Sequence, residues 1–126
     1  MPNPNPMSER FASQRLMERL DHDVELAGEI VSVFLEDSPA TLARLDNACK
    51  DANIAEIRLA THKLKGALLN VNAISAVESV ALLEAAALTG DSTLVNEPLC
   101  NVKAEIAALT ATLKSFIEED HESSHC

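Results

Sequence analysis

Residues 53–72 read NIAEIRLATHKLKGALLNVN, and the prediction of the fold begins from their apolar pattern. Its apolar side chains recur at the three- and four-residue spacing of one helix face, which predicts an amphipathic helix packed against other helices. Asn53, with Glu56 three residues later, fits an N-cap, and the predicted helix ends near Asn70. The face expected in the core comprises Ile57, Ala60, Thr61, Leu64, Leu68 and Val71.

The opposite face of this predicted helix carries the residues with chemical potential. His62, Lys65 and Gly66 lie at positions i, i+3 and i+4, so an imidazole, an ammonium and a position without a side chain face the same way. This pattern suits a histidine nucleophile that receives a compact anion, with the lysine neutralising charge and the glycine admitting a bulky partner. The whole outer face comprises Arg58, His62, Lys65, Gly66 and Leu69.

The charge around His62 departs from that of the whole chain. The sequence has 20 acidic and 10 basic residues and a formal net charge of −10, yet residues 57–77 contain no carboxylate. Arg58, Lys63 and Lys65 all fall within this stretch, and Arg58 lies one turn before His62. A lone histidine usually belongs to an ordinary solvated helix face, but the local loss of acid favours a basic site for an anion.

The chain before residue 53 is expected to form a short first helix followed by a longer helical segment. Residues 1–7 predict a disordered leader, after which Ser8 can cap a short helix that ends near Leu20. A second helix is expected from about Asp23, where Pro39 leaves two interpretations open, because a proline either kinks one long helix or begins a new one. The residues expected to point inward are Phe11, Leu16, Leu20, Ala27, Ile30, Val31, Phe34, Leu42, Leu45 and Cys49.

Two more helices are expected after the turn at residues 70–73. The first begins near Ile74 and stops at Gly90, a residue type that favours helix C-caps. The last begins between Ser92 and Pro98, and its apolar stripe approaches a heptad repeat. The residues expected to point inward are Val77, Val80, Leu83, Ala87, Leu99, Val102, Ile106, Leu109, Leu113 and Phe116.

Amphipathic helices joined by short turns predict an all-α fold, namely an antiparallel four-helix bundle with a short additional N-terminal helix. The composition agrees, because helix-forming Ala, Leu and Glu are abundant and 126 residues suffice for one core. The domain is expected to span residues 8–118, between the leader at residues 1–7 and a flexible acidic tail at residues 119–126. One such bundle buries the predicted stripes, so a monomer is expected.

The composition also argues against several classes of protein. The net charge of −10 speaks against nucleic-acid binding, which needs clustered Lys and Arg. The sequence lacks an apolar run of the ~18–20 residues that a membrane span needs, and its Pro- and Asn-rich start does not resemble a signal peptide. Three unpatterned cysteines predict free thiols in a reducing cytoplasm. His121, His125 and Cys126 could chelate a metal, but a terminal acidic segment predicts a flexible tail instead.

Residues 60–89 resemble the histidine-containing phosphotransfer (HPt) domain, whose signature is His-x-x-Lys-Gly on the second helix of a four-helix bundle. The matching run is His62-Lys63-Leu64-Lys65-Gly66-Ala67. The upstream residues 33–39 (VFLEDSP) and the downstream residues 83–86 (LEAA) also resemble the family. The resemblance extends over roughly residues 20–117.

The resemblance implies a role in a multistep His–Asp phosphorelay. His62 would be the phosphorylation site, taking a phosphoryl group from the aspartate of a receiver domain and passing it to another receiver. The implied partners are response-regulator receiver domains and a hybrid sensor histidine kinase, with Mg²⁺ bound by the receiver. No cofactor, metal, kinase activity or ATP site of its own is expected, and Gly28, Gly66 and Gly90 are too scattered for a phosphate-cradling loop.

The other site residues have expected roles that follow partly from the resemblance and partly from their positions around the helix. Lys65 would stabilise the phosphoryl charge and Gly66 would allow the partner to approach. Arg58, Lys63 and Leu69 are expected to contact the partner.

Two positions depart from the family pattern, which usually has Gly or Ala seven residues after the histidine and Gly ten residues after it. Asn72 can replace the glycine because Asn tolerates left-handed backbone angles. Leu69 is either a specificity anchor, which we favour, or a hindrance to docking, or it packs against the neighbouring helix. It is also the one feature that favours the alternative function, a phosphorylation-independent helical adaptor that binds a receiver domain or kinase.

Overall fold

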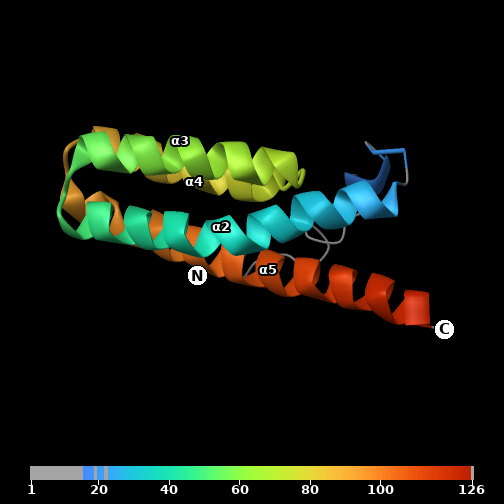
Figure 1. Ribbon diagram of the computed structural model, residues 1–126. Helices are drawn as coiled ribbons and strands as arrows, with labels where there is room; N and C mark the ends of the chain where they lie inside the picture. The colour runs from blue at the N-terminus through green and yellow to red at the C-terminus, as the bar shows by residue number, and fades with distance from the viewer. Residues whose placement is uncertain (1–15, 19, 22, 126) are drawn as a thin grey trace.

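The computed structural model describes residues 16–18, 20–21 and 23–125 of the chain, with side chains through residue 117 (Figure 1). Within these residues the regular secondary structure is entirely helical, which confirms the all-α prediction. The elements are α2 (Val24–Lys50), α3 (Ile54–Asn70), α4 (Ile74–Leu88), the 3₁₀-helix η1 (Ser92–Leu94) and α5 (Asn96–His125).

Side-chain caps and left-handed turn residues set the helix boundaries. Asp23 accepts a hydrogen bond from the backbone N–H of Leu26 at 3.0 Å and begins α2. Asn53 accepts one from the N–H of Glu56 at 3.2 Å and begins α3, as the sequence predicts. Asn72 has φ +59° in the turn between α3 and α4, which confirms that it can replace a glycine there.

The open question at Pro39 is resolved in favour of one long helix. Helix α2 continues through Pro39, and the proline itself is exposed. Pro39 cannot donate a backbone hydrogen bond to the carbonyl of Leu35, but the buried Thr41 hydroxyl donates to the Asp37 carbonyl at 3.3 Å. The buried side chains on both sides of the proline, Phe34 and Leu45, keep the helix packed along its whole length.

The four long helices pack in a ring around one apolar core. Helix α2 contacts α3, α3 contacts α4, α4 contacts α5, and α5 returns to α2. All six residues of the predicted core face of α3 are buried, Ala60, Thr61, Leu64 and Leu68 without measurable exposure. Figure 1 shows that α2 and α5 extend past the ends of the shorter pair α3 and α4.

The structure describes only part of the predicted first helix but most of the C-terminal segment. Residues 16–18 are helical, whereas the leader at residues 1–7 and the start of the predicted first helix lie outside the described residues. Helix α5 continues to His125, beyond the expected end at residue 118. No Gly or Pro follows Pro98, so the sequence contains nothing that would stop this helix earlier.

Candidate functional site

His62 lies on the exposed side of α3, as the helical periodicity predicts. Its side chain borders an open groove of about 780 Å³ between α2 and α3. The groove lies where residues 26–37 of α2 approach residues 62–70 of α3. The groove is lined by Leu26, Glu29, Ile30, Val33, Phe34 and Asp37 of α2 and by His62, Lys63, Gly66, Ala67 and Asn70 of α3.

The groove beside His62 is mainly apolar with charged edges. Val33 is 56% exposed and Leu26 is 40% exposed, although both are large hydrophobic side chains. Glu29 and Asp37 add negative charge along α2, and Lys63 adds positive charge along α3. An exposed apolar patch with a polar rim is typical of a protein-binding surface.

Lys65 does not stand alone in solvent beside His62. Its ammonium forms an ion pair with Glu84 of α4, with 3.0 Å between Lys65 Nζ and Glu84 Oε1. Both side chains are partly buried, with 27% of the lysine and 21% of the glutamate exposed. The sequence places three cations in a stretch without carboxylates, but the fold brings a carboxylate to one of them.

Glu84 gathers several groups of α3. Its Oε2 accepts a hydrogen bond from the Thr61 hydroxyl at 3.3 Å, and that hydroxyl also lies 3.1 Å from the Arg58 carbonyl. The hydrogen bond from Lys65 is the main reason why the pKa of Glu84 lies below its usual value. Thr61 and the positive charge of Arg58 lower the pKa of Glu84 further, so the carboxylate is ionised at neutral pH.

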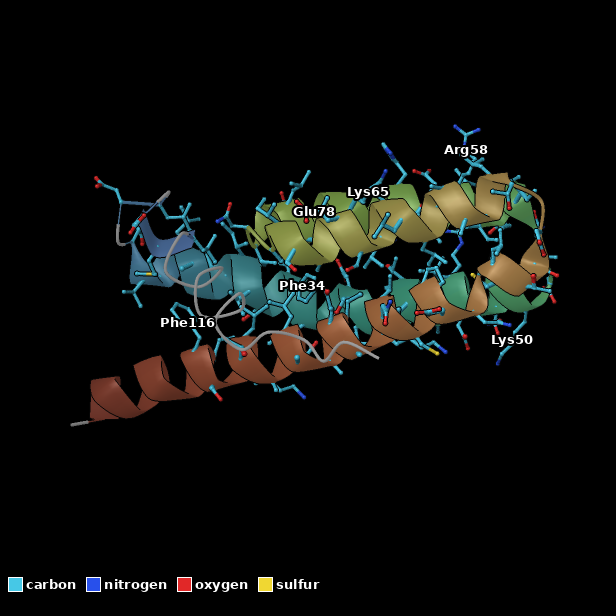
Figure 2. The ribbon with its side chains drawn as sticks, turned by 180° about the vertical axis from the view of Figure 1, so that it is seen from behind. Phe34, Lys50, Arg58, Lys65, Glu78 and Phe116 are labelled. Carbon is cyan, nitrogen blue, oxygen red and sulfur yellow. The ribbon has the colours of Figure 1, made fainter. Side chains whose placement is uncertain are left out.

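The remaining predicted site residues are all exposed on α3, with Lys63 bordering the groove toward α2. Arg58, Lys63 and Gly66 are exposed, and Figure 2 shows Arg58 projecting away from the bundle. Leu69 is 47% exposed two turns after His62. A Cβ atom added at Gly66 would have no neighbour within 4 Å in the domain itself, so packing inside the fold does not require this glycine.

Sequence reasoning missed the contribution of two neighbouring helices to this site. Glu84 lies in the run of residues 83–86 that resembles the family, but its contact with Lys65 depends on the register between α3 and α4. The apolar wall that α2 supplies was assigned in part to the core, since Ile30 and Phe34 are inward on the helical wheel. In the structure Ile30 is only half-buried and also borders the groove.

The described part of the chain contains neither a cluster of metal-binding side chains nor a helix that could span a membrane. Nowhere in that part do three or more His, Cys, Asp or Glu side chains come together as metal ligands would. The predicted absence of metal at His121, His125 and Cys126 concerns side chains beyond residue 117, which are not described. Each described helix is too short or too polar to span a lipid bilayer.

Comparison with protein families identifies the family of this chain. The family model of the Hpt domain matches residues 29–116, well over half of the chain. The chain belongs to the Hpt domain family. Hpt domains take part in His–Asp phosphorelay within two-component signalling and interact with receiver domains and kinases. Neither a curated protein nor a solved structure gives a significant match.

The matched range includes most of the predicted site residues and of the groove beside them. It contains His62, Lys65 and Gly66 on α3, the counter-charge Glu84 on α4, and nearly all of the groove. Leu26, which borders the groove at the start of α2, lies just before the matched range.

Proposed function

We propose that this Hpt domain is a phosphotransfer intermediate in which His62 carries the phosphoryl group. It would accept the group from the aspartate of one receiver domain and pass it to the aspartate of another. The observation that supports this most strongly is the position of His62, exposed at the rim of an apolar groove with Lys65 one turn further along the same helix.

The transfer needs a neutral imidazole nitrogen that faces solvent. That nitrogen attacks the phosphorus of the aspartyl phosphate, a P–N bond forms, and the P–O bond to the aspartate breaks. The receiver carboxylate leaves with the electron pair of that bond. The second transfer runs the same step in reverse, with the carboxylate of the next receiver as nucleophile.

The other residues of the site would position and stabilise rather than react. Lys65 would neutralise charge on the phosphoryl group in the transition state and in phosphohistidine. Gly66 would allow the receiver backbone to come close, since its surface is open. The receiver would supply Mg²⁺, so this chain would need no cofactor and no ATP site of its own.

The groove between α2 and α3 would seat the partner. The partner would bury the apolar side chains of the groove. Arg58, Lys63 and Leu69 would contact receiver domains or a hybrid sensor histidine kinase around the phosphoryl group. Leu69 is exposed beside the site and does not fill the core, which supports its role as a specificity anchor.

The finer architecture is part of this proposal. Consecutive long helices that contact each other and are joined by short segments support an antiparallel four-helix bundle with a short additional N-terminal helix. The predicted core stripes are buried within one chain, which supports a monomer. Unpaired thiols at Cys49 and Cys100 support a cytoplasmic location.

A transfer assay tests the proposal. Purified wild-type protein, His62→Gln and the matched control His121→Gln are mixed with ³²P-labelled receiver domains, and the label is followed at neutral or alkaline pH. Label on the wild type and on His121→Gln, but not on His62→Gln, is the expected result. Because His62 is exposed, the variant should keep its fold and its affinity for the receiver. Receiver binding without any label on the wild type would refute phosphotransfer and leave the adaptor function.

A further inference from the structure

The charge balance around His62 involves a carboxylate from another helix. Lys65 is the cation expected to hold a phosphoryl group, yet in the unphosphorylated domain its ammonium already binds Glu84 at 3.0 Å. A lysine cannot fully neutralise two anions at once, since it carries one positive charge. Glu84 therefore reduces the positive charge that Lys65 can present to a phosphoryl group.

We propose that Glu84 is a positioning residue that competes with the phosphoryl group for Lys65 and so limits how strongly His62 retains the group. This inference rests on the proposed phosphotransfer function and concerns the regulation of the same site. It assigns to Glu84 a role in the equilibrium between phosphohistidine and phosphorylated receiver.

Within the ion pair, Glu84 is held in place more firmly than Lys65. The Glu84 carboxylate is fixed from two sides, because Thr61, whose side chain is fully buried, approaches one oxygen and Lys65 binds the other. Lys65 has a flexible four-carbon chain with three donor protons, so it can turn between partners that lie on either side of it. His62 lies one turn before Lys65 on the same helix, within reach of that chain.

The electrostatic consequence has a definite sign. A phosphoryl group on His62 adds roughly two negative charges beside Lys65. Glu84 adds a further negative charge on the other side of the lysine and thereby weakens the positive potential at the phosphoryl group. The phosphohistidine is then less stable relative to the aspartyl phosphate, which suits a protein that must pass the group on.

The ion pair also joins α3 to α4, so a purely structural role must be separated from this one. Glu84→Gln removes the charge but keeps hydrogen-bonding oxygen and nitrogen atoms at the same distance along the side chain. Glu84→Asp keeps the charge and shortens the side chain. If charge is what matters, Glu84→Asp should stay close to the wild type while Glu84→Gln does not.

The experiment measures the equilibrium distribution of ³²P between the domain and one receiver, approached from both directions. Glu84→Gln should shift the equilibrium toward phosphohistidine on the order of threefold to tenfold, as expected for loss of one nearby, partly screened charge. Glu78→Gln removes an exposed charge from the same helix and serves as the matched control, with little shift expected (Figure 2). In a Lys65→Met background, Glu84→Gln should have a smaller effect, because the competition no longer exists.

Three results would overturn the inference. The first is an unchanged equilibrium in Glu84→Gln while the wild type is labelled, which leaves phosphotransfer by His62 intact. The second is an equal shift in Glu78→Gln, which would show a general charge effect. The third is a wild type that takes no label from any receiver that it binds, which removes both this inference and the proposed function. Urea denaturation of each variant checks that differences in transfer do not follow from unfolding.

Discussion

Replacement of Gly66 by alanine should raise the stability of the domain and lower its rate of phosphotransfer. Gly66→Ala places a methyl group on the exposed side of α3, four residues after His62. The added Cβ has no neighbour within 4 Å inside the domain, so the fold accommodates it without rearrangement. Any loss of function must then come from contact with a partner outside the chain.

The expected gain in stability follows from the helix. Glycine in a helix interior is less favourable than alanine by about 0.5–1 kcal/mol, because the more flexible unfolded chain loses more entropy on folding. For a chain of this length, that gain corresponds to a rise in melting temperature of roughly 2–6 °C. The rate of transfer should fall by about tenfold, because a displacement of the docked receiver by a methyl group disturbs the alignment of the reacting atoms.

Gly28 provides the matched control for this experiment. It lies inside α2, a Cβ atom added there also has no neighbour within 4 Å, and it does not border the groove beside His62. Gly28→Ala should therefore raise the stability by a similar amount and leave the transfer rate unchanged. Urea or thermal denaturation gives the stability, and single-turnover transfer from a labelled receiver gives the rate.

Two outcomes would refute the reasoning about Gly66. A destabilised Gly66→Ala would show that the glycine is needed by the fold itself. A stabilised Gly66→Ala that transfers as fast as Gly28→Ala would show that receivers do not approach this part of α3.

Three further predictions test other parts of the structure. Leu69→Ala should weaken receiver binding severalfold in a titration. It should change the free energy of unfolding by less than about 1 kcal/mol, because the side chain is 47% exposed. Receiver binding equal to that of the wild type would refute the role of Leu69 as an anchor. The pKa of Glu84 lies below its usual value of 4.5, so its stabilising contribution is complete above that value and is lost as the pH falls through the lowered pKa. The difference in urea midpoint between wild type and Glu84→Gln should therefore be smaller at about pH 3 than at about pH 6. An equal difference at the two pH values would contradict this. Pro39→Ala should stabilise the protein by roughly 1–3 kcal/mol and raise its urea midpoint, because the exposed position regains a backbone hydrogen bond. A urea midpoint below that of the wild type would show that proline fits this site better than alanine.

The local features of the sequence predicted the helices of this fold closely. Asn53 begins α3 and the turn at Asn72 ends it, because capping and left-handed turns depend on residues within a few positions of each other. The buried face of α3 was also predicted in full, since its apolar and polar residues separate clearly around the helix.

Other features could not be read from local patterns. Helix α4 is apolar on most sides, so periodicity placed Leu83 correctly in the core but did not identify Ala76 as buried, and Val77, expected to point inward, is only half-buried. Pro39 is compatible with a kinked or a new helix until the packing on both sides of it is known. The ion pair of Lys65 with Glu84 joins residues 19 positions apart, and only the register between α3 and α4 brings them together.

The unequal lengths of the helices give this domain the shape of a step. Helix α2 has 27 residues and α3 has 17, which correspond to about 40 Å and about 25 Å of helix. In Figure 1 the N-terminal part of α2 projects past the end of α3, and Leu26 on this projection borders the groove that His62 also borders.

If a partner docks over His62 as proposed, a body longer than α3 would therefore also reach the projecting part of α2. Contact with this ledge would lie at only one end of the groove. The excess length of α2 would thus distinguish the two ends of the groove for a partner and favour one direction of docking over the reverse.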